Sequence, residues 1–201
     1  MEKKYVVTIA RQFGSLGRSI AHSLSDILGI EYYDRDIVDA VAKNLGLPVS
    51  VVSDAEETKS RYFGMSVPLG NGAADVQKKI FEEESRIIHD LTDKESCIIV
   101  GRCADYVLGN QKNALHVYIY APYEARYRNC LDVLQMTPDA AKKMISKVDK
   151  ARAAYHKHYA GYLPGDFNHQ NLMIDSSLLG IDGTARALAD VVHQKFFFDE
   201  E

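Results

Sequence analysis

Apolar residues recur along this chain with two periods, one typical of strands and one typical of helices. Residues 5–10 (YVVTIA) are a short β-rich run. Apolar residues then follow at helical spacing from Ile20 to Leu28, and Gly29 is the residue type that ends helices. The same pattern predicts further strands at 30–33, 97–100, 115–120 and 172–174, and further helices within 34–46, over 76–91, from 137 past Tyr155, and from a cap at Asp182 onward.

Strands that alternate with helices predict an α/β fold, in which a parallel sheet is covered by helices on both faces. The start of the long helix at residue 137 is well marked. Thr137 is a favoured N-cap type, Pro138 suits the first helical position, and Asp139 suits the first turn. In such folds ligands bind at the carboxyl ends of the strands, so the residues that follow each strand carry the functional information.

Length and charge narrow the classes of protein to consider. The chain has 201 residues, of which 46% are hydrophobic, and we expect a single domain over residues 1–201. A formal net charge of -4 disfavours general nucleic-acid binding. No segment approaches the roughly 20 apolar residues of a membrane span, and the first apolar run is too short for a signal peptide. Three cysteines without a CxxC pair fit buried thiols in a reducing compartment, so we expect a cytoplasmic protein without a membrane partner.

The predicted strand ends are unusually rich in arginine. Several guanidinium groups that converge on one crevice would repel one another unless an anion with several charges lay between them. The alternative is that some of these arginines are surface residues paired with nearby acids. The polar residues concerned are Arg11 to Ser19 after the first strand, Asp34 and Arg35 after the second, Arg102 and Asp105 after the third, and Arg126 and Arg128 after the fourth.

The stretch QFGSLGRS, residues 12–19, follows the first strand and resembles a phosphate-binding loop. The loop pattern is GxxxxGK[ST], from which this chain departs with Gln12 at the first glycine and Arg18 at the lysine. Gly14 and Gly17 still allow the backbone to wrap closely so that amides point inward, and Ser19 is suited to hold Mg²⁺. The alternative is a glycine turn that merely joins strand and helix.

Several segments together resemble the cytidylate kinase-like proteins, a branch of the P-loop nucleoside monophosphate kinases. They are TIARQFGSLGRSIA, YYDRDIVDAVAK, IIVGRCADYVL, KVDKARAAYHKHYAG and MIDSSLLGID, which cover nearly the whole chain in the family's order. The family itself carries arginine in place of the loop lysine, whereas Leu16 replaces a more usual glycine. The resemblance implies a P-loop kinase three-layer α/β/α sandwich with a central, mainly parallel five-stranded sheet and a helical lid.

The resemblance also implies a role for each matching residue. ATP, with Mg²⁺ on Ser19, would bind over the loop, and the acceptor nucleotide would bind across the crevice, with cytidylate favoured. Phosphoryl transfer needs in-line positioning and positive charge rather than a strong base. The implied residues are Gly14, Ser15, Leu16, Gly17, Arg18 and Ser19 for ATP; Asp34, Arg35, Arg102 and Asp105 for the acceptor; Lys147, Asp149 and Arg152 in a lid over about 137–165; and Arg18, Arg102 and Arg152 for catalysis.

Two parts of the chain have less specific patterns. His156 and His158 are two residues apart and diverge on a helix, which disfavours a metal pair. Residues 54–75 are rich in glycine and polar residues, which predicts a mobile loop or hairpin beside the acceptor site, or an oligomer contact.

Three functional hypotheses follow. The first is a nucleoside monophosphate kinase, the second a kinase of another small acceptor, and the third a nucleotide-binding regulatory protein without catalysis. The replaced loop lysine is the best argument for the third. The sequence leaves the oligomeric state open.

Overall fold

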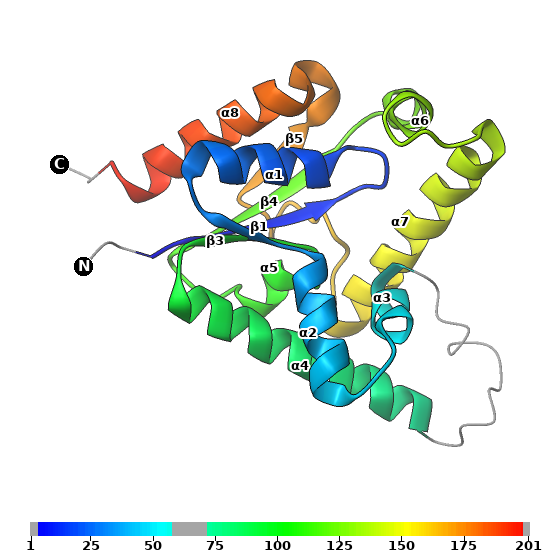
Figure 1. Ribbon diagram of the computed structural model, residues 1–201. Coiled ribbons are helices and arrows are strands. Elements are labelled where there is room, and N and C mark those ends of the chain that lie inside the picture. The colour runs from blue at the N-terminus through cyan, green and yellow to red at the C-terminus, as the bar shows by residue number, and fades with distance from the viewer. Residues whose placement is uncertain (1–3, 58–71, 199–201) are drawn as a thin grey trace.

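Five parallel strands form the central sheet of the protein, and helices cover both of its faces (Figure 1). The computed structural model describes residues 4–57 and 72–198. The order of the strands across the sheet is β2-β3-β1-β4-β5, so β2 and β3 lie on one side of β1, and β4 and β5 lie on the other. The strands are β1 (Val6–Arg11), β2 (Glu31–Tyr33), β3 (Cys97–Val100), β4 (Ala114–Tyr120) and β5 (Leu172–Asp175).

Helices lie at each of the places where the apolar pattern predicts one, but residues 49–57 and 104–107 are helical without such a prediction. They are α1 (Gly17–Leu28), α2 (Arg35–Leu45), α3 (Val49–Glu57), α4 (Gly72–Lys94), α5 (Ala104–Val107), α6 (Tyr123–Asp132), α7 (Pro138–Ala160) and α8 (Ser176–Phe196). Glycine ends the first two as expected, because Gly29 and Gly46 both have left-handed backbone angles. The Thr137 hydroxyl accepts a hydrogen bond from the amide of Ala140 and caps α7 as predicted.

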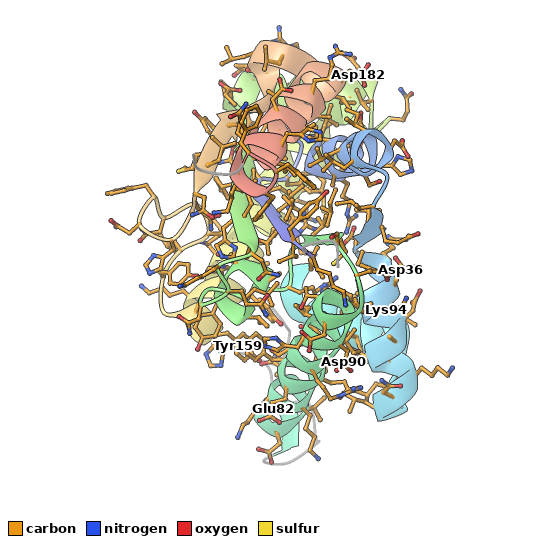
Figure 2. All side chains as sticks on the ribbon, turned by 90° about the vertical axis from the view of Figure 1, so that its left-hand side faces the viewer. Asp36, Glu82, Asp90, Lys94, Tyr159 and Asp182 are labelled. Atoms are coloured by element: carbon orange, nitrogen blue, oxygen red, sulfur yellow. The ribbon has the colours of Figure 1, made fainter. Side chains whose placement is uncertain are left out.

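Alternate residues of the strands separate the core into two halves. Val7 and Ile9 of β1 pack with α1 and α8 on one face, whereas Val6 packs with α2 and α4 on the other. β3 divides in the same way between Ile98 and Ile99. Charged side chains such as those of Asp36, Asp90 and Asp182 lie at the surface (Figure 2). This arrangement confirms the predicted α/β/α sandwich with a five-stranded sheet, and the sheet is parallel throughout.

Two expectations about helix boundaries were wrong. The last helix begins at Ser176 and not at Asp182, because the Asp175 side chain accepts from the amide of Ser177 and caps it there; the helix is then kinked at Gly180. The stretch 54–75 is helical at both ends, since α3 runs to Glu57 and α4 begins at Gly72. The rest of the predicted loop, residues 58–71, lies outside the described residues.

The carboxyl ends of the strands are flanked by α6 and α7, which form a third and smaller cluster. Cys130 of α6 packs against Ala141 and Ile145 of α7, and Phe13 from the segment after β1 joins them. This cluster carries two helices to the edge of the sheet where ligands bind in such folds. Cys97, Cys103 and Cys130 are buried thiols, as expected.

Candidate active site

The segment that joins β1 to α1 has the strained backbone of a tight ligand loop. Gly14 has φ +80°, and a Cβ atom there would lie 2.8 Å from the carbonyl oxygen of Arg126. Leu16 also has a left-handed backbone, with φ 59°. A Cβ atom on Gly17 would lie 2.8 Å from Cβ of Arg11. Both glycines are therefore required by close approach, and Leu16 stores strain at this turn.

Three consecutive carbonyl groups of this loop are held from outside. The carbonyl oxygens of Phe13, Gly14 and Ser15 accept hydrogen bonds from the side chains of Arg126 (3.2 Å), Asn129 (2.9 Å) and Ser176 (2.8 Å), respectively. The carbonyl and the N–H of a trans peptide point in opposite directions, so the amides of Gly14, Ser15 and Leu16 are turned away from these three side chains. The amide of Ser15 also makes a long contact of 3.4 Å with the carbonyl of Gln12.

Asp149 and Arg126 fix the first peptide of the loop between two helices. The Asp149 carboxylate accepts from the amide of Phe13 at 2.7 Å and from Nη1 of Arg126 at 2.5 Å. The same Nη1 donates to the carbonyl of Phe13. Asp149 belongs to the predicted lid, and in this structure it contacts the phosphate loop directly.

Arg18 leans across the first turn of α1 toward the end of β2. Its Nε lies 2.5 Å from Oδ2 of Asp34, and Oδ1 of the same carboxylate lies 3.8 Å from Nη2 of Arg11. The Arg18 side chain is 41% exposed, whereas those of Arg11 and Asp34 are buried. Asp34, which the sequence suggests for acceptor binding, thus joins the loop arginine to the arginine that ends β1.

Arg102 is buried and faces the interior rather than the crevice. Its Nη1 lies 3.4 Å from Oε1 of Glu84 on α4, and the Tyr155 hydroxyl donates to Oε2 of Glu84 at 2.7 Å. Arg102 is 1% exposed and Glu84 is 0% exposed. Arg102 and Cys103 both have left-handed backbones, with φ 59° and 49°. This network joins α4, the β3–α5 turn and α7.

Asp105, which the resemblance implies for acceptor binding, is the centre of a second buried cluster. Both of its carboxylate oxygens lie 3.0 Å from Nε2 of His156, and it also accepts from Gln170 (2.9 Å) and Tyr162 (3.4 Å). Burial alone would raise the pKa of Asp105, but hydrogen bonding and charge from His156 outweigh burial and lower that pKa below its ordinary value. Asp105 is therefore an anion that ties α5 to the end of α7.

The other predicted site residues lie further out. Arg35 and Lys147 are exposed, and Ser19 is half-buried in the first turn of α1. Tyr159 stacks on Phe81 at 3.9 Å between ring centroids. His156 and His158 do not form a pair, since His156 is engaged with Asp105 and His158 is exposed.

Sequence reasoning missed three residues that shape the site. Glu84 occupies a core position of an apolar helical stripe, between Ile80 and Ile88, and a charge at such a position was a usable signal. Ser176 directly follows β5 and could have been found by the strand-end rule. Asn129 lies three residues after Arg126 on the same helix face, but nothing in the sequence relates either of them to Gly14.

The sequence of the chain matches a family model over residues 6–178, which is described as the cytidylate kinase-like family. Because the match covers most of the chain, the protein belongs to this family. Family and fold together support a phosphotransferase of the P-loop kinase class. Comparison with curated protein sequences finds no match.

Solved structures with low sequence identity share the fold. An uncharacterized protein from Eubacterium ventriosum has a TM-score of 0.72 at 22% identity, with 94% of this chain and 98% of that chain covered. Shikimate kinase from Bacteroides thetaiotaomicron has a TM-score of 0.57 at 10% identity, with coverage of 94% and 98%. Shikimate kinase from Acinetobacter baumannii in complex with shikimate has a TM-score of 0.51 at 16% identity, with coverage of 96% and 93%.

Within residues 4–57 and 72–198, none of the helices is long and apolar enough to cross a membrane. The same residues contain no group of three or more histidine, cysteine or acidic side chains arranged to hold a metal ion.

Proposed function

We propose that this protein transfers the terminal phosphoryl group of ATP to a nucleoside monophosphate, with cytidylate the favoured acceptor. The family and the fold support the general class of reaction. The preference for cytidylate rests on family resemblance alone.

The observation that carries the proposal is the loop whose carbonyls are held from outside. The carbonyl oxygens of Phe13, Gly14 and Ser15 are held by side chains outside the loop, so the amides of Gly14 and Leu16 would face a ligand on the opposite side. The amide of Ser15 donates to the carbonyl of Gln12. The N-terminus of α1 adds its dipole at the same place, and Arg18 adds a charge. Backbone amides, a helix start and a cation are the requirements of a polyphosphate site.

Phosphate oxygens on the acceptor are already nucleophilic, so this reaction needs positioning and positive charge and no strong base. The Ser19 hydroxyl, as a hard oxygen ligand in the first turn of α1, fits Mg²⁺ held together with ATP phosphates. The bound ion would neutralise charge that develops on the transferred group. Lys147, Asp149 and Arg152 belong to the proposed lid. Asp149 contacts the loop through the amide of Phe13, and Arg152 contacts the carbonyl of Arg11 at the end of β1.

A second candidate is a kinase of a small acceptor that carries no phosphate. The specific observation in its favour is that Arg102, the proposed ligand of the acceptor phosphate, is buried beside Glu84. A neutralised arginine in the interior has less to offer a monophosphate than an arginine that faces the crevice.

ADP release with Mg²⁺ separates the candidates. Purified protein is incubated with ATP and a panel of nucleoside monophosphates, and then with hydroxyl-bearing acceptors such as shikimate and small sugars. Turnover of at least one monophosphate is expected. Turnover of a phosphate-free acceptor alone would establish the second candidate, and ATP binding without any ADP release would exclude both.

A further inference from the structure

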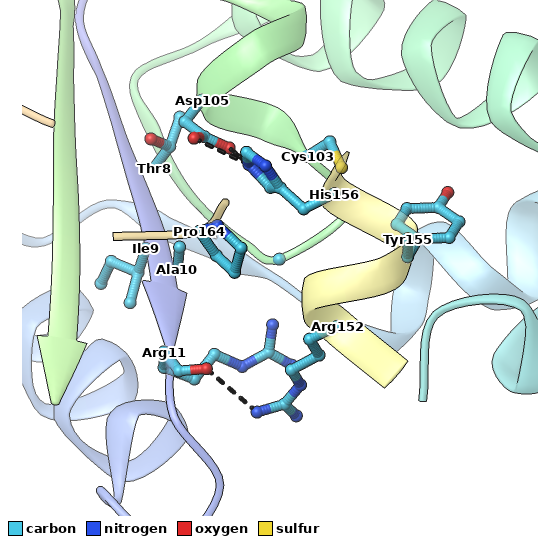
Figure 3. A pocket seen from close by; sticks show the side chains of 11 residues that line it. Thr8, Ile9, Ala10, Arg11, Cys103, Asp105, Arg152, Tyr155, His156 and Pro164 are labelled. Carbon is cyan, nitrogen blue, oxygen red and sulfur yellow. Dashed lines mark hydrogen bonds and ion pairs between the residues drawn. The ribbon is translucent and has the colours of Figure 1, made fainter. Parts of the chain in front are cut away.

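The pocket on the acceptor side is lined by two arginines, and neither of them is Arg102. Arg11 enters from the end of β1 and Arg152 from α7, and Figure 3 shows both side chains on the same side of this pocket. Arg102 points the other way, toward Glu84. We propose that Arg11 and Arg152 together bind the oxyanion of the acceptor, a phosphate monoester, and that Arg102 braces the wall behind it.

A direct contact holds the two arginines in a fixed relation. Nη1 of Arg152 donates to the backbone carbonyl of Arg11 at 3.2 Å. This bond brings two cationic groups, 141 positions apart in the sequence, to one wall of the pocket. An anion between the two guanidinium groups would interact favourably with both, in addition to the Asp34 carboxylate, which lies 3.8 Å from Nη2 of Arg11. A phosphate monoester suits the site because guanidinium groups bind its oxygens in a forked geometry.

Arg11 also places this anion next to the nucleotide. Its side-chain stem packs so closely on Gly17 that a Cβ atom there would lie 2.8 Å away, so the stem rests on the phosphate loop. Asp34 contacts both Arg11 and Arg18 and thus orients the acceptor arginine and the loop arginine together. An acceptor held by Arg11 therefore lies beside the terminal phosphate of a nucleotide in the loop, as in-line transfer requires.

The Glu84 network explains why Arg102 belongs to the wall. The Glu84 carboxylate is shared between Arg102 and the Tyr155 hydroxyl, and Tyr155 also lines the pocket. Because Tyr155 lies one helical turn after Arg152 on α7, the brace fixes the helix that presents Arg152. Arg102 acts on the acceptor through this wall and is a positioning residue.

Equilibrium titration of the full chain tests the site. The loop is first saturated with a non-hydrolysable ATP analogue and Mg²⁺, so that added anions do not bind there. Cytidine monophosphate and inorganic phosphate are then titrated separately into the wild type, R11Q, R152Q and R186Q. Arg186 is an exposed arginine on α8 and serves as the charge control.

R11Q and R152Q are each expected to weaken binding of both anions by about tenfold or more, the loss of one charge-assisted contact. Affinity for the ATP analogue should change less than about threefold, and R186Q should behave as the wild type. Because Arg11 is buried, R11K is included: it keeps the charge, loses the fork, and should lose part of the affinity. Thermal unfolding establishes that each variant is folded.

The proposal is overturned if R11Q and R152Q bind the monophosphate like the wild type, if they lose the ATP analogue equally, or if the wild type binds neither anion. The transfer step rests on the proposed function, but anion binding does not. Phosphate binding that depends on both arginines, without any turnover, would therefore refute the proposed function but support the anion site. Normal turnover in both R11Q and R152Q would support the proposed function but refute the anion site.

Discussion

The two sides of the crevice are built in different ways. On the side proposed for the nucleotide, one continuous segment, residues 12–19, would supply backbone amides, and side chains of α6, α7 and α8 hold its backbone in place. On the side proposed for the acceptor, the groups that line or support the pocket are side chains from β1, α4, the turn after β3, and α7. The first side depends on local conformation, and the second depends on packing between distant elements. Substitutions on the two sides should therefore affect stability and binding in different ways.

The largest effect is expected where the acceptor side depends on a buried ion pair. Glu84→Ala leaves the Arg102 guanidinium in the interior without this carboxylate, which should lower the free energy of unfolding by about 3–5 kcal/mol. Denaturant unfolding measures the loss. Glu83→Ala is the matched control: Glu83 pairs with Arg86 near the surface and its loss should cost under about 1 kcal/mol. Equal costs for the two would show that the network does not carry the acceptor side.

On the nucleotide side the corresponding change is Gly14→Ala. The new Cβ would lie 2.8 Å from the Arg126 carbonyl at a left-handed backbone, and we expect a loss of about 2–3 kcal/mol, together with weakened ATP binding. Gly46→Ala is the control, because Gly46 is also left-handed but has nothing within 4 Å of its added Cβ. It should cost only about 1–2 kcal/mol. Unfolding and nucleotide titration of both variants separate close approach from backbone strain.

The contrast also explains how much the sequence could predict. The strand CIIV and the helix ends at Gly29 and Gly46 can be predicted from the local sequence alone. A buried parallel strand requires apolar residues, and a left-handed helix end favours glycine. The loop was recognisable for the same reason, since Gly14 and Gly17 reflect a local requirement of the backbone. The strand at 97–100 and the helix ends at Gly29 and Gly46 were confirmed, whereas phosphate binding by the loop stays a prediction.

The side proposed for the acceptor was harder to predict from the sequence, because its contacts join residues that are far apart in the chain. The strand-end rule placed Arg102 and Asp105 at the correct edge of the sheet. It could not show that Arg102 would contact Glu84 or that Asp105 would contact His156. A charged side chain at such an edge points toward the neighbour that carries the opposite charge. That neighbour comes from tertiary packing and has no fixed spacing in the sequence.

A smaller effect is expected from the loop arginine. Arg18→Ala should weaken ATP binding or reduce turnover by about 1–3 kcal/mol, the range for a charged phosphate contact. Its partner Asp34 also contacts Arg11, so the acceptor affinity should fall slightly as well. Arg186→Ala, an exposed arginine on α8, provides the comparison. Unchanged ATP affinity and turnover in Arg18→Ala would remove Arg18 from the nucleotide side.

The smallest effect is expected at Leu16. The informative quantity is the sign of the stability difference between its glycine and alanine variants. Inside a helix alanine is more stable than glycine by about 1 kcal/mol, and Ser23→Ala against Ser23→Gly in the middle of α1 should follow that order. Leu16 has φ 59°, where any side chain is strained by about 1–2 kcal/mol. Leu16→Gly should therefore be more stable than Leu16→Ala, by about 1 kcal/mol, because both lose the same packing and only glycine relieves the strain. Thermal unfolding measures the stability of all four variants. If alanine were more stable than glycine at Leu16 as well as at Ser23, Leu16 would not be held in a left-handed conformation. The proposed inward direction of the loop amides would then lose its basis.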